Sequence, residues 1–180
     1  AGYDSFMRLK NMRSKEWMQY FPRGLRGFGA NMLQLMKPSV SSDKLSEFLR
    51  LQYYYIENVY PLMRKVLTDK KIKELTGKNE LTENRVFKIV NEMIGVKGAA
   101  ATYSDLSKVS IAELSTYLQN VLLRDTDQMS MAHALEVRVP FLDHHLVSYV
   151  LGVRDGMKIP HTPKKLLVDS LGDLIPSEIV

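Results

Sequence analysis

The sequence has no cysteine. Disulfide frameworks, cysteine-based zinc sites and a cysteine nucleophile are therefore excluded within these 180 residues, and the composition fits a cytoplasmic chain. Long apolar runs are missing too: none approaches the roughly 18 residues of a membrane span, and the N-terminal stretch lacks the apolar core of a secretory signal. We expect a cytoplasmic protein with no membrane partner. Because Ala1 stands where an initiator Met would, we also expect the chain to be excised from a longer protein.

Positive charge is unevenly distributed. The chain has 25 basic and 20 acidic residues, a net charge of +5. Residues 1–40 hold seven basic and two acidic side chains, so this segment carries the whole excess and the remainder balances at 18 of each. Such a segment is either a solvated helix face or a binding surface for nucleic acid or an acidic partner. No aromatic stacking pattern of an RNA-binding module accompanies it, so nucleic acid is not expected as a partner.

Apolar residues recur at helical spacing, and no series of alternating strands is visible. We expect helices over residues 4–20, 43–58, 69–76, 82–94, 110–125, 143–152 and 163–171, and short extended pieces at 138–142 and 157–159. The glycines at 24, 27 and 29 predict a flexible turn between helices. The run Tyr53–Tyr55 predicts core packing or an interface between lobes. The fold prediction is all-α, as a single domain over residues 1–180.

Several helix boundaries carry recognisable capping chemistry. Ser110 and Glu113 form a capping box, which predicts a helix start at Ser110. Gly77 and Gly172 follow predicted helices, as glycine commonly does at a C-terminus. Asp143 is placed to cap a short helix that ends at Gly152.

Two groups of charged residues are candidates for a site. Asp125 continues an apolar stripe that runs from Leu114, so we expect it to be partly buried and paired. Asp127, Glu136 and Arg138 form either an ion-pair network around the extended piece or contacts with a substrate. Lys164 and Lys165 fall in the first turn of a predicted helix, where a lysine next to free backbone N–H groups suits phosphate or a developing negative charge.

One long segment carries a family resemblance. Arg124-Asp-Thr-Asp-Gln-Met-Ser-Met-Ala-His-Ala-Leu-Glu-Val-Arg-Val-Pro-Phe-Leu-Asp143 closely resembles the signature of glutamine-hydrolysing asparagine synthetases. The match continues into Pro163-Lys-Lys-Leu-Leu167 and Leu174-Ile-Pro176, and Ala1-Gly-Tyr3 resembles the residues after the family's Gly-Glu-Gly-Gly-Asp-Glu-Leu-Phe loop. Residues 103–180 carry the signature, whereas residues 1–100 resemble a variable helical part.

The resemblance implies a two-domain parent enzyme. A glutaminase domain releases ammonia, and a synthetase domain of the α/β ATP pyrophosphatase type adenylates aspartate with ATP and Mg²⁺ before ammonia displaces AMP. This chain is similar to the helical C-terminal lobe of that synthetase domain. It lacks the family's Ser-Gly-Gly-x-Asp-Ser and Gly-Glu-Gly-Gly-Asp-Glu motifs. We therefore expect no metal ligand and no bound ATP or Mg²⁺ in this chain, inactivity in isolation, and partnership with the missing glutaminase domain and pyrophosphate-loop lobe.

Few catalytic roles carry over from the family. Lys164 matches the lysine that stabilises negative charge on phosphate and in the transition state. Asp127 and Arg138 are candidates for substrate binding, and the structural signature positions are Glu136, Pro140, Phe141 and Asp143. Val168 and Gln128 stand where the family commonly has arginine or a basic residue. An amidotransferase acting on another carboxylate therefore stays open, as does a helical binding module with a basic N-terminal surface.

Overall fold

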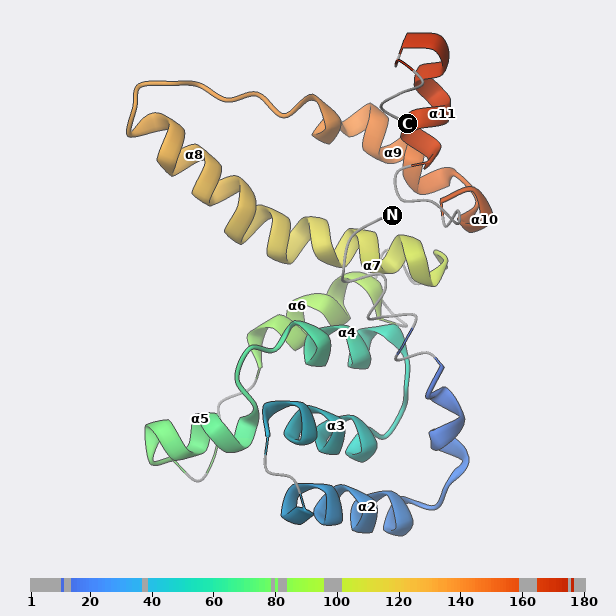
Figure 1. The fold of residues 1–180 in the computed structure, drawn as a ribbon, viewed down its shortest axis with the longest axis vertical. Coiled ribbons are helices and arrows are strands. Elements are labelled where there is room, and N and C mark those ends of the chain that lie inside the picture. Colours follow the sequence, from blue (N-terminus) through green and yellow to red (C-terminus); the bar gives the residue numbers. More distant parts are fainter. Residues whose placement is uncertain are drawn as a thin grey trace. The chain divides into compact units, whose positions relative to one another are not determined.

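The computed structural model of this chain describes residues 11, 14–36, 39–78, 80, 84–95, 102–158, 165–174 and 176. Regular structure in these residues is helical, with no strand among them, which confirms the all-α prediction. The chain folds as two compact units that divide between Thr102 and Tyr103 (Figure 1). We call the described residues up to Thr102 the N-terminal unit and those from Tyr103 onward the C-terminal unit.

Helices of the N-terminal unit pack in a layered order. They are η1 (Glu16–Tyr20), α2 (Arg23–Met36), α3 (Val40–Arg50), α4 (Ile56–Arg64), α5 (Asp69–Thr76) and α6 (Arg85–Ile94). Helix α2 packs on α3, α3 contacts α4, and α4 packs on α6 (Figure 1). The core lies around α4, whose residues are buried from Ile56 to Met63 except Asn58, and Pro61 sits inside this helix without ending it.

The predicted helix over 43–58 is wrong, because the chain breaks it at residues 51–55. Helix α3 begins after Ser39, whose side chain accepts a hydrogen bond from the Ser42 N–H, and ends at Arg50. Tertiary contacts replace the lost helical bonds. The Leu51 carbonyl accepts from Arg26 at 3.0 Å, and Tyr54 packs edge-to-face on Phe48 with ring centroids 4.6 Å apart. Tyr53 and Tyr55 stack on each other and stay exposed.

The predicted glycine turn is also wrong, since Gly24, Gly27 and Gly29 all lie within α2. Each glycine costs about 1 kcal/mol relative to alanine in a helix interior. Packing against α3 outweighs that cost, because most helical stability in proteins comes from tertiary contacts. Pro22 directly precedes the helix, and its carbonyl accepts from the Arg26 N–H at 3.2 Å.

The two helices that complete the N-terminal unit end as capping chemistry indicates. Helix α5 ends at Gly77, which has a left-handed φ of 65°, so that prediction is confirmed. Helix α6 starts after Asn84, whose side chain accepts from the N–H groups of Val86 and Phe87. The expected start at Thr82 lies outside the described residues, as do residues 4–10.

The C-terminal unit begins with one long helix made of three consecutive elements. The elements of the whole unit are α7 (Asp105–Glu113), η2 (Leu114–Leu123), α8 (Arg124–Met131), η3 (Pro140–Leu142), α9 (His144–Gly152), α10 (Asp155–Lys158), α11 (Lys165–Leu171) and η4 (Gly172–Leu174). The first three run on without a break, and the middle one is a π-helix, a form that is rare beyond single turns and often marks functional regions. Leu106, Val109 and Ala112 of α7 are buried.

Three predictions of secondary structure fail in this unit. The piece expected to be extended over residues 138–142 winds into the helical turn η3 at Pro140–Leu142. The capping box at Ser110–Glu113 does not start a helix: Ser104 caps α7, and the Ser110 hydroxyl lies inside it, donating to the Leu106 carbonyl at 2.9 Å. Met157 lies in the helical turn α10 rather than in an extended piece. The cap of Asp143 on α9, the end of that helix at Gly152 and the end of α11 before Gly172 are confirmed.

Candidate functional site

The family-like segment forms a helix, an arm and a second helix. Helix α8 ends in a tight hydrogen-bonded turn, where the Leu135 N–H donates to Ser130 O and the Ala134 N–H to Met131 O. This is the pairing of a Schellman motif, with Ala134 in the left-handed position at φ 56° where glycine is usual. Residues 135–139 then form an extended arm that leads back to η3 and α9 (Figure 1). The turn therefore sets the direction of the whole arm.

The charged signature residues are only partly brought together. Arg138 Nη2 lies 2.6 Å from Glu136 Oε1, which confirms this pair of the predicted network. Two residues apart on an extended chain, these side chains fall on the same side. Asp127 is exposed on α8, and its carboxylate has no ion-pair partner among the residues that the structure describes. Asp125 is exposed as well, so its predicted burial is wrong.

Asp143 and the residues before it fix the start of α9. Pro140 occupies the first position of η3. Asp143 Oδ1 accepts from the N–H groups of His145 and Leu146 at 3.0 and 3.1 Å. This N-cap is worth about 1 kcal/mol and holds the end of the arm against the helix.

Large apolar side chains of the same segment are uncovered. Met129 and Met131 of α8, Leu135, Val137 and Val139 of the arm, and Phe141 of η3 are all exposed. A group of exposed large apolar side chains in one segment is typical of an interaction site. The segment is thus internally ordered while its apolar side chains lack a cover.

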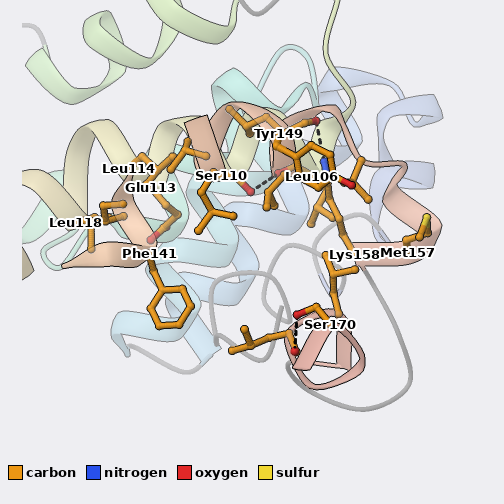
Figure 2. Close-up of a pocket in the computed structure, with 18 of the residues that line it drawn as sticks. Leu106, Ser110, Glu113, Leu114, Leu118, Phe141, Tyr149, Met157, Lys158 and Ser170 are labelled. Carbon is orange, nitrogen blue, oxygen red and sulfur yellow. Dashed lines mark hydrogen bonds between the residues drawn. The ribbon is translucent and has the colours of Figure 1, made fainter. Parts of the chain in front are cut away.

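Beside this segment lies an apolar pocket of about 820 Å³ within the C-terminal unit. Its walls come from α7 and η2 on one side and from α9, α10 and α11 on another, and Phe141 stands at its edge (Figure 2). Leu114, Leu118 and Leu122 of the predicted apolar stripe line it. The polar lining residues include Ser110, Glu113, Lys158 and Ser170.

Lys158 is the polar residue of this region that sequence reasoning missed. It is only 9% exposed, and its Nζ donates to Ser107 Oγ at 3.0 Å and to the Leu151 carbonyl at 2.9 Å. Burial lowers the pKa of Lys158, and the Asp155 carboxylate 4.0 Å away opposes that shift. The amine thereby ties α10 to α7 and to the last turn of α9. The spacing of Asp155 and Lys158, three residues apart, was the available sequence signal.

Lys164 lies outside the described residues, and α11 begins at the next residue, Lys165. Within the described part of the chain, no group of three histidine or acidic side chains is placed to hold a metal ion. None of the described helices is long and apolar enough to cross a bilayer.

Comparison with known proteins identifies the family of this chain. The family model described as asparagine synthase matches residues 1–180. Asparagine synthetase [glutamine-hydrolyzing] 1 of Bacillus subtilis (strain 168) is 30% identical over 82 residues, covering 45% of this chain and 13% of the relative. Asparagine synthetase [glutamine-hydrolyzing] of Homo sapiens is 46% identical over 68 residues, covering 36% of this chain and 12% of the relative.

The aligned region therefore spans about an eighth of the length of these relatives. No solved structure matches the chain. Because the family match extends over every residue, from Ala1 to Val180, this chain belongs to the asparagine synthase family.

Proposed function

We propose that this chain is part of the synthetase domain of an ATP-dependent, glutamine-hydrolysing asparagine synthetase, and that it is inactive by itself. In the parent reaction, the aspartate carboxylate would attack the α-phosphate of ATP to form an acyl-adenylate and release pyrophosphate, and ammonia from glutamine would then displace AMP. The proposal rests above all on the ordered but uncovered signature segment, residues 124–143.

The uncovered side chains indicate what the segment contributes. Met129, Val137 and Phe141 expose apolar surface that costs free energy in water, at about 25 cal/mol per Å². A lobe that carries the pyrophosphate loop would cover this surface, and the glutaminase domain would complete the parent protein. The pre-set turn at Ala134 and the cap at Asp143 limit the ordering entropy that such docking would cost.

The charged pair in the arm is proposed to shape the wall of the synthetase site. Glu136 and Arg138 are 70% and 85% exposed, so in water their pairing contributes little to stability. Once the arm is covered, the ion pair with Glu136 would fix the orientation of the Arg138 guanidinium. The remaining guanidinium N–H groups would then be left to bind a substrate carboxylate or phosphate. Asp127 is the second candidate for substrate contact.

Lys164 is the proposed catalytic residue. Its ammonium would stabilise negative charge that develops on the phosphate and on the acyl-adenylate during amide formation. The lysine precedes α11 in sequence, so Lys158 and the packing of α10 against α11 would position the chain that carries it.

Titration of the isolated chain with Mg–ATP and aspartate tests whether the chain is inactive by itself. We expect no heat of binding by calorimetry and no AMP formation, because the chain lacks the family's nucleotide-binding motifs. Saturable binding that Lys164→Ala abolishes would show that this chain holds more of the site than proposed. AMP formation by the chain alone would contradict its inactivity.

A second acceptor carboxylate is favoured by two residues. Val168, half-buried on α11, and Gln128, exposed on α8, stand where the family commonly carries basic side chains. Loss of positive charge would weaken recognition of an α-carboxylate, so the parent would act on a carboxylate other than that of free aspartate. Pyrophosphate release by the full-length protein, measured across a panel of carboxylic acids, distinguishes the two. Release with aspartate alone would contradict the second acceptor.

A further inference from the structure

The arm of residues 135–139 has an extended backbone that pairs with no strand among the described residues. It runs from the turn at Ala134 to the helical turn η3, and all of its residues are exposed (Figure 1). The ion pair of Glu136 with Arg138 fits this conformation, since side chains two residues apart lie on the same face of an extended chain. The Schellman turn fixes one end of the arm, and the cap of Asp143 on α9 fixes the other. The arm therefore has the shape of a strand before a partner binds.

One edge of the arm carries free backbone groups. On an extended chain, the backbone groups of alternate residues point to opposite edges. The edge of Leu135 and Val139 is partly used within the chain, because the Leu135 N–H donates to Ser130 O at 3.0 Å and the Val139 carbonyl accepts from an N–H of η3 at 2.9 Å. On the opposite edge, the N–H and C=O groups of Glu136 and Arg138 form no hydrogen bond with the rest of the described chain. Such an edge is a template for pairing with a further strand.

The order of residues in the arm is complementary to itself. Two antiparallel copies with Val137 opposite Val137 would place Glu136 opposite Arg138 twice. On the other face, Leu135 would lie opposite Val139 twice. Opposite charges and apolar side chains that face each other across two strands are stabilising, whereas like charges directly opposite are destabilising. Registers that place Glu136 opposite Glu136 or Arg138 opposite Arg138 are therefore disfavoured, and charge selects a single register.

The same register satisfies the free backbone groups. Residues opposite each other in an antiparallel pair alternate between exchanging both of their hydrogen bonds and exchanging none. With Val137 at a position that exchanges none, Glu136 and Arg138 would exchange both with the opposite residue of the other copy. The hydrogen bonding would end there, because Pro140, the next residue on this edge, has no N–H. At the other end, Ala134 has a left-handed φ that a strand cannot contain.

We propose that two copies of this chain pair through their arms as an antiparallel β-ribbon, with a twofold axis at Val137. The arm carries one charge of each sign, so the pairing brings no excess charge together. A different partner would have to present the opposite order of charges at the same spacing, whereas a second copy supplies that order by symmetry. The contact uses the backbone edge, so the apolar side-chain face of the ribbon stays open to the lobe proposed above. The pairing does not depend on the proposed synthetase role.

Sedimentation of the 180-residue chain at increasing concentration tests the proposal. Because the arm is short, we expect a weak, reversible dimer that forms between high micromolar and millimolar concentration. Raised salt should weaken it. Amide exchange measured by NMR gives a local readout. As the dimer fraction rises, exchange of the Glu136 and Arg138 amides should slow, while the Val137 amide, on the other edge, should keep its rate.

Charge reversal in the arm identifies the contact. Glu136→Arg and Arg138→Glu each place like charges opposite each other, so each should weaken the dimer by at least about tenfold. The two single variants, mixed in equal amounts, should associate with each other about as strongly as the wild-type chain does with itself. The double variant with both substitutions should dimerise to a similar extent, because it restores opposite charges.

Matched controls make the same changes of charge on helix α8. Asp125→Arg and Arg124→Glu alter exposed residues outside the arm and should leave the dimer affinity unchanged. Circular dichroism checks that every variant keeps its helices.

Several results would overturn the proposal. They are a chain that stays monomeric at every concentration, a dimer that both arm variants retain, an equal loss in the α8 controls, and a mixture of the two arm variants that stays monomeric. Slowed exchange of Val137 in place of Glu136 and Arg138 would also contradict it, because the other edge would then form the contact.

Discussion

Replacing Lys158 with methionine should destabilise the C-terminal unit by about 2 kcal/mol at neutral pH. The wild-type amine makes hydrogen bonds of 3.0 and 2.9 Å to Ser107 and Leu151, and bonds to a charged group are worth about 1.5–3 kcal/mol each. Desolvation of the buried amine opposes that gain. Methionine fills a similar volume, and the Leu151 carbonyl keeps a donor in the Ser107 hydroxyl at 3.3 Å, so the net loss is smaller than the two bonds.

The pH dependence of this loss has a definite sign. Burial lowers the pKa of Lys158 below the ordinary value of about 10.4. Between the folded-state pKa and that value, the unfolded chain binds more protons than the folded chain, so wild-type stability rises with pH across this window. The Lys158→Met variant lacks this contribution. The difference in stability between wild type and variant should therefore widen from pH 7 to pH 10.

Urea unfolding followed by circular dichroism at both pH values measures the difference. Lys108→Met, on the same unit, is the matched control and should change stability by less than about 0.5 kcal/mol at either pH. A difference for Lys158→Met that stays constant or narrows as the pH rises would refute the reasoning. So would an equal effect of both variants.

Substitutions at four positions test the local structure. Arg26→Ala should destabilise the N-terminal unit by about 2–3 kcal/mol, because it removes two hydrogen bonds and leaves a cavity. Urea unfolding followed by Trp17 fluorescence measures this loss. An unchanged urea midpoint would contradict the inward packing of Arg26. Asp143→Ala should cost about 1 kcal/mol by removing the cap of α9, and Asp143→Asn should restore most of it. Gly77→Ala should lower the free energy of unfolding by about 1 kcal/mol, and Ala134→Gly should raise it by about 1 kcal/mol, because both residues have a left-handed φ. The melting temperatures of the two variants should therefore shift in opposite directions. Shifts of the same sign would contradict the left-handed conformations.

Capping chemistry allowed the sequence to predict several boundaries. Gly77 and Asp143 act through neighbours within three or four residues, so their effect can be recognised without knowing the fold. The pairing of Glu136 with Arg138 was predictable for the same reason, since an extended chain places alternate side chains on one side.

Other features depend on residues far apart in the chain. The break at residues 51–55 exists because Arg26, 25 residues earlier, binds the Leu51 carbonyl, and Tyr54 enters the core. Asp125 was expected to be buried from a stripe extrapolated at 3.6 residues per turn. All residues from Gln119 to Met129 except Leu123 are exposed, so this end of the helix has no buried side for the stripe to face.

The burial of Lys158 and of Arg26 could not be predicted from the sequence for a similar reason. Sequence spacing shows that a helix has two faces, but not which of them the core will take. In α2 the core takes the face of Arg26, and in α10 it takes Lys158, against the usual exposure of charged side chains. Such reversals become visible only when the neighbouring helices are in place.

Aspartate-dependent release of pyrophosphate by the full-length protein that contains this chain tests the central proposal most directly. Lys164→Ala should lower this release by a factor of about 10² to 10³ while leaving glutamine hydrolysis unchanged. Lys165→Ala, at the neighbouring position, should retain most of the synthetase activity. Full activity of the Lys164→Ala protein would contradict the catalytic role proposed for Lys164. No aspartate-dependent release from the wild-type protein would contradict the assignment of this chain to an asparagine-forming synthetase domain.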